Sequence, residues 1–320
     1  MPSHLLAPRT TIELKEVGGL GSVDSKYVVI MPSRDEARFI AGALQSLVNQ
    51  TIPPILCVVV DDGSTDQTAD IAEEFSRRHA WIRVVRRPDR GGRAVGGGVV
   101  EAFYAGYGRL EIDDYQFICK MDADVTLGPR YFETAMRRMA EDERLGGVSG
   151  KVFNPVGNGE KEERIIDEMV SGALNFWRRA CWEQVGGYVR EVMWDGIIVH
   201  RARMFGWKTR SYRDEDLRIV HHRLMGSSHK SVLHGRLRWG RGQWFMGTHP
   251  VYILASGVFR FRERPYVIGG LLIIAGYYAA ALTGAKRYDD LAFRSHLRSW
   301  QLKRLGLGFL APTPPEATSV

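Results

Sequence analysis

Cysteines are few, and their spacing does not suit a disulfide framework or a zinc site. Cys57, Cys119 and Cys181 lie far apart, among apolar or aromatic neighbours. A disulfide-rich domain or a structural zinc site needs more numerous or more closely spaced cysteines, so we expect reduced, buried thiols. Residues 1–19 also lack an apolar run long enough for a secretory signal, which predicts that the chain begins in the cytoplasm.

Three common ligand-binding motifs are absent as well. The glycine-rich stretch 91–98 lacks the Lys-Ser/Thr pair of a phosphate-binding loop and the spacing of a dinucleotide fingerprint. Residues 62–70 carry Gln67 where a calcium-binding loop needs glycine for its sharp turn. These absences argue against a P-loop ATPase, a dinucleotide-dependent dehydrogenase and an EF-hand protein.

Basic residues are concentrated near the C-terminus. Residues 231–305 contain twelve Lys or Arg and three acids, a surplus larger than the net charge of +7 for the whole chain. The same segment has two runs without charged residues, 242–259 and 265–285, separated by Arg-Phe-Arg-Glu-Arg at 260–264. Arginines among aromatic residues beside apolar runs are typical of binding to an anionic membrane surface. We therefore predict a membrane partner and no nucleic acid.

The apolar run 266–285 is just long enough to cross a bilayer, because ~20 helical residues span a hydrocarbon core of ~30 Å. Its four glycines and one threonine weaken that interpretation. We favour partial insertion from the cytoplasmic face over a single crossing. A buried helix of a soluble domain is the third possibility.

The first two hundred residues alternate short apolar runs with amphipathic stretches, which predicts an α/β fold with a mainly parallel sheet flanked by helices. Ser64 and Gln67 have the spacing of a capping box that would begin the second helix. We expect strands at 27–31, 55–60, 81–85 and 117–121, and helices at 38–48, 64–78 and 98–107. The predicted organisation is a tail at 1–25, a nucleotide-binding α/β domain at 26–230, a helical membrane-associated region at 231–305 and a tail at 306–320.

Three of the predicted strands end in acidic turns. These turns are Pro-Ser-Arg-Asp-Glu at 32–36, Asp61-Asp62-Gly63 and Asp122-Ala-Asp124. Ligands of open α/β sheets bind beyond the carboxyl ends of the strands, so we expect these side chains to line one site. Carboxylates suit a ligand with hydrogen-bond donors, such as a base, a ribose or a sugar, together with a divalent metal that brings a phosphate.

Five motifs, in this order, resemble the family-2 nucleotide-sugar glycosyltransferases with the GT-A fold, of the membrane-associated bacterial type. The resemblance extends over about residues 27–222. The motifs are 32–36 with the helix end at 46–53, the sequence Val-Val-Val-Asp-Asp-Gly-Ser-Thr-Asp at 58–66, Asp122-Ala-Asp124, the segment 176–188 with its Gly-Gly turn, and Trp194-Asp195 ahead of 201–207.

The resemblance implies a nucleotide-sugar donor, with a UDP sugar favoured over a GDP sugar. Arginines of the glycine-rich stretch, Arg90 or Arg93, would line the donor pocket. The residues expected to bind the donor are Pro32, Arg34, Glu36, Asp61, Asp62, Arg93 and Asp122.

A cofactor, Mg²⁺ or Mn²⁺, is implied with it. Asp124 would be the more direct metal ligand and Asp122 the second, and either His221 or His222 could approach the metal or the diphosphate. The bound ion would stabilise the charge that develops on the leaving group.

On the acceptor side, Asp195 corresponds to the family's catalytic base, which would give inversion in a single displacement. The family usually has two acids here, and Trp194 replaces the first. Arg238 and Trp239 resemble the Arg-x-Arg-Trp part of a motif of processive synthases, but Gly235 replaces the preceding glutamine. This favours a non-processive enzyme with a lipid-linked or saccharide acceptor.

Simpler interpretations stay open for each residue. The acids could be turn residues or a helix N-cap, the histidines could be structural, and Trp239 could only pack helices. Two rival functions remain: a sugar-nucleotide nucleotidyltransferase, and a catalytically silent membrane-associated binding module.

Overall fold

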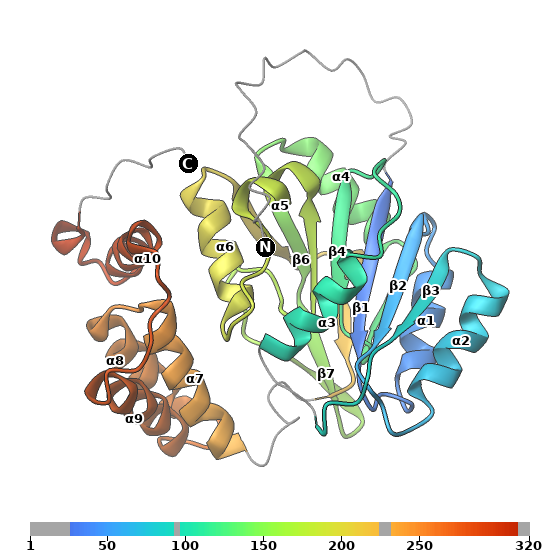
Figure 1. Ribbon diagram of the computed structural model, residues 1–320. Helices are drawn as coiled ribbons and strands as arrows, with labels where there is room; N and C mark the ends of the chain where they lie inside the picture. The colour runs from blue at the N-terminus through green and yellow to red at the C-terminus, as the bar shows by residue number, and fades with distance from the viewer. Residues whose placement is uncertain (1–25, 93–96, 224–231, 313–320) are drawn as a thin grey trace, which may run out of the picture.

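The computed structural model describes residues 26–92, 97–223 and 232–312. Its centre is a seven-stranded sheet with the order β10-β6-β9-β4-β1-β2-β3 (Figure 1). Neighbouring strands are parallel except β9, which is antiparallel to both β4 and β6. The strands are β1 (Tyr27–Ser33), β2 (Leu56–Asp61), β3 (Ile82–Arg86), β4 (Phe117–Met121), β6 (Leu145–Gly150), β9 (Leu174–Arg178) and β10 (Lys208–Tyr212). The mainly parallel sheet that we expected is confirmed.

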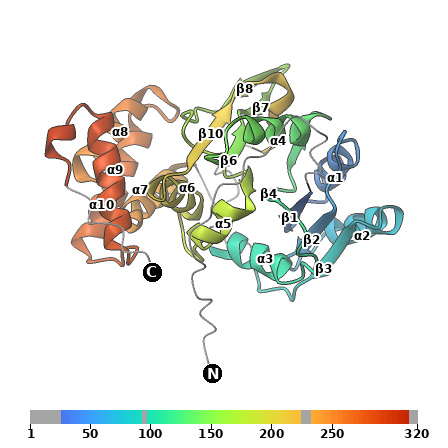
Figure 2. The ribbon, with the colours of Figure 1, turned by 90° about the horizontal axis from the view of Figure 1, so that it is seen from above.

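Helices cover both faces of this sheet (Figure 2). Strand side chains alternate in direction, so Val29 and Met31 of β1 pack in one apolar cluster and Val28 and Ile30 in the other. Coverage on both sides explains why β2 is apolar at consecutive positions. One face is covered by α1 (Ile40–Val48), α2 (Thr68–Arg78) and α4 (Tyr131–Glu141), and the other by α3 (Gly97–Tyr107), α5 (Arg179–Val185) and α6 (Trp194–Met204).

A smaller sheet of order β5-β11-β7-β8 joins segments that are distant in the sequence. Its strand β11 is antiparallel to β5, with His221 opposite Val125. His221 therefore lies beside the residue that follows Asp124. The strands are β5 (Val125–Leu127), β7 (Val152–Val156), β8 (Gly159–Glu162) and β11 (Ile219–His221).

The capping box predicted from Ser64 and Gln67 is wrong. Helix α2 begins at Thr68, and its N-cap residue Gln67 makes no capping bond through its side chain. Ser64 instead donates its hydroxyl to Asp61 and accepts a bond from the backbone N–H of Asp35. Ser64 stabilises the turn after β2, so the helix begins about one turn later than we predicted.

Four helices follow the α/β layer and lie at its β10 end, beside α6 (Figures 1 and 2). An apolar cluster that includes Ile197, Phe245 and Leu297 joins α6 to α7 and α10. The helices are α7 (Val232–Met246), α8 (Pro250–Phe259), α9 (Ile268–Leu282) and α10 (Leu291–Arg304). Short 3-10 helices are η1 (Glu215–Leu217), η2 (Arg260–Arg262) and η3 (Gly308–Leu310).

The single crossing considered for 266–285 is not supported. Helix α9 has 15 residues, a length of about 22 Å against a hydrocarbon core of about 30 Å. Within residues 26–92, 97–223 and 232–312, no helix is both long and apolar enough to span a membrane.

The glycines of this run have a packing role instead. A Cβ at Gly276 would collide with the carbonyl of Leu237 on α7, and one at Gly240 would collide with the carbonyl of Ile273 on α9. The absence of these side chains lets the backbones of α7 and α9 approach closely.

We predict that Gly276→Ala destabilises the protein by about 1–3 kcal/mol, the usual cost of overpacking a close contact. Gly42→Ala is the matched control, because Gly42 is also helical and its Cβ would meet Thr126 at an ordinary 3.6 Å. Alanine favours helix there by up to about 1 kcal/mol. Urea denaturation measures both; equal stability of the two variants would contradict the packing role.

Candidate active site

The three acidic turns do meet at one edge of the sheet. Ser33 at the end of β1 lies opposite Asp61 at the end of β2, and the backbone N–H of Asp62 donates to the carbonyl of Ser33 at 2.8 Å. Strand β4 is parallel to β1 on its other side, so Asp122 and Asp124 follow at the same edge. Pro32 is still within β1, opposite Val60.

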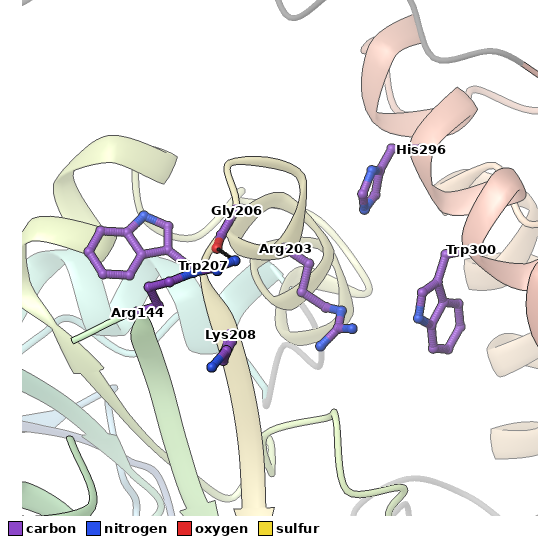
Figure 3. A pocket seen from close by; sticks show the side chains of 7 residues that line it. All are labelled: Arg144, Arg203, Gly206, Trp207, Lys208, His296 and Trp300. Atoms are coloured by element: carbon purple, nitrogen blue, oxygen red, sulfur yellow. Dashed lines mark hydrogen bonds between the residues drawn. The ribbon is translucent and has the colours of Figure 1, made fainter. Parts of the chain in front are cut away.

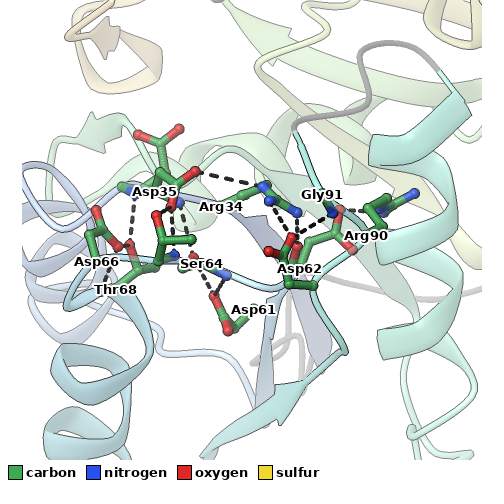
Figure 4. A network of polar contacts seen from close by, with 12 residues as sticks. Arg34, Asp35, Asp61, Asp62, Ser64, Asp66, Thr68, Arg90 and Gly91 are labelled. Atoms are coloured by element: carbon green, nitrogen blue, oxygen red, sulfur yellow. Dashed lines mark hydrogen bonds and ion pairs between the residues drawn. The ribbon is translucent and has the colours of Figure 1, made fainter.

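The first group of polar residues surrounds Asp62 (Figure 4). Its carboxylate forms ion pairs with Arg87 at 2.5 Å and with Arg90. Arg34 is buried, donates to the carbonyl of Asp62 at 2.7 Å and pairs with Asp89 at 2.6 Å. Two guanidinium groups thus balance the carboxylate that we expected to bind the nucleotide.

Asp61 has the geometry of a turn residue. Its carboxylate accepts bonds from the backbone N–H and the hydroxyl of Ser64, three residues further along the chain. Arg93, the remaining predicted donor residue of this region, lies outside the described residues.

The second group joins Glu36, Asp124 and His221 through Arg223. Nη2 of Arg223 lies 2.6 Å from Oε2 of Glu36, and Nε lies 3.6 Å from Oδ2 of Asp124. Nε2 of His221 lies 3.4 Å from the other oxygen of Asp124. The two carboxylates and the histidine are buried, so the turns after β1 and β4 and the end of β11 share one charged cluster.

Of the two candidate histidines, His221 is the one that faces Asp124. His222 is exposed; its Nε2 lies 3.0 Å from the hydroxyl of Thr126, and its ring stacks on Phe39. The alternation of side chains along an extended strand explains why adjacent histidines point apart.

The two carboxylates of the Asp-x-Asp pair have opposite pKa shifts. Burial, with the nearby charge of Asp124, raises the pKa of Asp122 despite the opposing effect of Lys120. Burial acts on Asp124 too, but its hydrogen bond with His221 and the charge of Arg223 outweigh it and lower the pKa. Burial would lower the pKa of His221, yet Asp124 and Glu163 raise it to about 10.

A divalent cation fits this cluster as a partner shared with a substrate. In the part of the chain that the structure describes, no three or more His, Cys, Asp or Glu side chains are grouped to hold a metal alone. Mg²⁺ commonly uses one or two carboxylates together with substrate phosphates. Both oxygens of Glu163 are buried without a hydrogen-bond partner, 3.7 Å from His221 at the closest. Glu163 has only this long ion pair with His221 and no hydrogen bond, so a cation bound beside Asp124 would add to its charge balance.

Asp195 lies in the first turn of α6, close to Gly172 in the segment that precedes β9. The N-cap of α6 is Met193, so Asp195 is not the N-cap residue that the simpler interpretation proposed. Its Oδ1 accepts from the N–H of Gly196 at 2.9 Å, and a Cβ at Gly172 would lie 2.9 Å from its Oδ2. Burial raises the pKa of Asp195, with Gly196 and Lys120 opposing the shift.

Arg238 and Trp239 differ in their surroundings. Trp239 packs in the apolar cluster of α7, α8 and α9, with the guanidinium of Arg260 4.6 Å from its ring centre. Arg238 has a buried Nη1 without a hydrogen-bond partner. The helix-packing interpretation therefore holds for Trp239, whereas Arg238 has a buried N–H donor that makes no hydrogen bond.

A cavity of about 240 Å³ lies away from these carboxylates (Figure 3). Arg144 and Lys208 line it where β6 and β10 begin, and His296 and Trp300 of α10 close its far side. It is therefore at the amino-terminal edge of the sheet, opposite the candidate active site.

Lys120, Glu163 and Arg87 had no assigned role in the sequence, and the contact of Arg223 with Glu36 was not predicted. Lys120 had a usable signal, because it precedes Asp122 by two positions and so shares its side of the strand. Arg223 follows the histidines but needs the pairing of β11 with β5 to reach Glu36. No motif around Glu163 in the sequence indicated a role for this residue.

Comparison with known proteins identifies the family. Residues 28–222 match glycosyl transferase family 2, and the chain belongs to that family. The probable glycosyltransferase YdaM of Bacillus subtilis is 31% identical over 129 residues, 39% of this chain and 29% of that protein. A chondroitin synthase of Pasteurella multocida is 24% identical over 181 residues, 55% of this chain and 16% of that protein. The chain thus spans less than a third of these curated relatives.

Solved structures confirm the GT-A fold. The mannosyltransferase PcManGT from Pyrobaculum calidifontis, in complex with GDP-Man and Mn²⁺, gives a TM-score of 0.52 at 16% identity, covering 91% of this chain and 89% of that one. Residues 1–349 of Staphylococcus aureus TarS, in complex with UDP-GlcNAc, give 0.50 at 16% identity, covering 90% and 82%.

We predict that Asp195→Asn stabilises the protein at neutral pH, by roughly 1 kcal/mol. The raised pKa means that ionised Asp195 costs folding free energy above its ordinary pKa. The gain should therefore grow as pH rises from acid to neutral, measured by urea denaturation.

Asp66→Asn is the opposite control. Burial is outweighed there by hydrogen bonds from Thr68, which lower the pKa of Asp66. Its carboxylate stabilises the fold at neutral pH and loses that effect as pH falls, so this variant should be less stable at pH 7. A destabilised Asp195→Asn would show that Asp195 is held by a partner instead of being desolvated.

Proposed function

We propose that this protein is an inverting, metal-dependent glycosyltransferase that moves a sugar from a nucleoside diphosphate sugar to a lipid-linked or saccharide acceptor. It would work at the cytoplasmic face of the membrane in polysaccharide or glycolipid synthesis. The observation that carries this proposal is the cluster of Glu36, Asp124, His221 and Arg223 at the sheet edge, together with the buried Asp195 in the first turn of α6.

The donor would bind along this edge. Glu36 and the turn at Asp62 would accept hydrogen bonds from the base and ribose, with Asp122 beside the sugar. Mg²⁺ or Mn²⁺, held by Asp124 and by His221 once its imidazolium has released its proton, would neutralise the diphosphate when bound. Arg223 already pairs with Glu36 and lies near Asp124, so a guanidinium is available to the leaving group.

Asp195 would act on the acceptor. Its carboxylate takes the proton of the attacking hydroxyl while the hydroxyl oxygen bonds to the anomeric carbon. The bond from that carbon to the phosphate oxygen breaks, and its electron pair leaves with the nucleoside diphosphate. A raised pKa brings Asp195 closer to the range of an effective general base.

Membrane association would use an exposed apolar face on α8 and the start of α9. Val251, Leu254 and Val258 are three or four positions apart and so share one side of α8. Phe259 is 59% exposed, and Tyr266, Val267, Ile268 and Leu271 are also exposed. Exposed Arg262 and Arg264 lie between the two groups, as expected for contact with anionic lipid.

The donor and base roles predict different effects in two variants. Asp124→Asn should abolish metal-dependent nucleotide binding, because it removes the central carboxylate of the cluster. Asp195→Asn should preserve that binding and lower transfer by at least about 10²-fold, the usual contribution of a general base. Calorimetry with UDP sugars and GDP-mannose, with and without Mn²⁺, followed by product analysis, measures both.

The same experiment separates the rival functions. A UDP sugar is the donor we propose, and a preference for GDP-mannose would overturn that choice alone. Pyrophosphate release from a nucleoside triphosphate would favour the nucleotidyltransferase. Absence of metal-dependent nucleotide binding by the wild type would favour the silent binding module and contradict the enzyme.

Membrane binding is tested by sedimentation with vesicles. We expect Phe259→Glu to lower binding to phosphatidylglycerol vesicles by at least about tenfold, since it removes a large apolar group and adds a negative charge. Val156→Glu is the control, because Val156 is similarly exposed but lies on β7. Equal losses in both variants, or equal binding to neutral phosphatidylcholine vesicles, would contradict the proposed face.

A further inference from the structure

Lys120 is a buried lysine between the two halves of the site. Its side chain is 2% exposed, and Nζ donates to Oδ1 of Asp122 at 2.5 Å and to the carbonyl of Gly172 at 2.7 Å. Burying an ammonium group is costly unless it is paired and hydrogen-bonded. A lysine in this position therefore needs both partners.

The contacts of Lys120 extend to the acceptor side. Its Nζ lies 5.1 Å from the ring centre of Trp194, the first residue of α6. Gly172, whose carbonyl it binds, is also the residue against which Asp195 rests. One ammonium group thus contacts Asp122 and two residues next to Asp195, Trp194 in the chain and Gly172 in space.

We propose that Lys120 is a positioning residue that fixes Asp122 for the donor and holds the start of α6, so that donor and base keep one relative placement. This inference rests on the proposed function. It adds a residue that links the donor-binding turn to the acceptor-side helix.

Electrostatics around Asp195 supports this role. Burial raises the pKa of Asp195, and Lys120, on β4, is the cation that opposes the shift, together with the N–H of Gly196. Tyr188 also faces Asp195, but its phenol stays neutral because burial raises its pKa well above the usual value. Removal of the ammonium charge should therefore make Asp195 harder to ionise.

The test compares Lys120→Met with Lys151→Met. Lys151 is equally buried, but its Nζ bonds to Asp167, Ser211 and the carbonyl of Ile165. Both variants lose a buried, paired ammonium, so both should lose stability. A role restricted to stability predicts the same kinetic result for the two.

We expect Lys120→Met to raise the donor KM, to lower kcat by at least about tenfold through misplacement of the reacting groups, and to move the acid limb of the kcat–pH profile to higher pH. Lys151→Met should leave all three unchanged. Lys120→Gln provides a second variant if the methionine variant does not fold, because it keeps a donor for Gly172 without the charge. Its acid limb should move in the same direction.

An unchanged acid limb in both Lys120 variants, with KM and kcat as in Lys151→Met, would overturn the proposal. Failure of the proposed function looks different, because the wild type would then transfer no sugar from any donor tested. In that case calorimetry with nucleotide and Mn²⁺ still tests the donor half. Weaker nucleotide binding by Lys120→Met than by Lys151→Met would support the positioning of Asp122 by Lys120. Equal nucleotide binding by the two variants would contradict it.

Discussion

The site depends on balancing negative charge that the fold gathers at one edge of the sheet. Parallel strands deliver Glu36, Asp62 and the Asp122–Asp124 pair to this edge, and most of these carboxylates are buried. Buried charges persist only when they are paired and hydrogen-bonded. Arg87 and Arg90 balance Asp62, Arg223 bridges Glu36 to the vicinity of Asp124, and Lys120 binds Asp122. A nucleotide and its cation would therefore bind by rearranging ion pairs that the protein already makes.

Asp124 is contacted by two basic side chains. His221 lies 3.4 Å from one oxygen of its carboxylate and Arg223 lies 3.6 Å from the other. A divalent ion would compete with these cations for the same carboxylate, and a diphosphate would offer Arg223 a new partner. On the acceptor side, Asp195 has no arginine or lysine in direct ion-pair contact among the described residues. Burial raises the pKa of Asp195, and the nearby ammonium of Lys120 limits this shift.

Local patterns predicted much of the fold and part of the site. The apolar run at β2 and the two-residue spacing of Asp122 and Asp124 are local signals, and both led to the correct sheet edge. The antiparallel strand β9 and the pairing of β11 with β5 depend on contacts between distant segments, which no local pattern records. For the same reason the sequence could not separate His221 from His222, predict the contact of Arg223 with Glu36, or give Glu163 a role. The sequence shows the glycines of α9. Only the tertiary structure shows that they allow close packing against α7.

A crystal structure of the protein with a nonhydrolysable UDP sugar and Mn²⁺ tests the central claim most directly. The account predicts the ion at Asp124, the diphosphate beside it, and Arg223 moved from Glu36 toward the leaving group, with Asp195 facing the anomeric carbon. A nucleotide bound elsewhere, or one bound at this edge while Arg223 still bridges Glu36 and Asp124 without an ion, would contradict it.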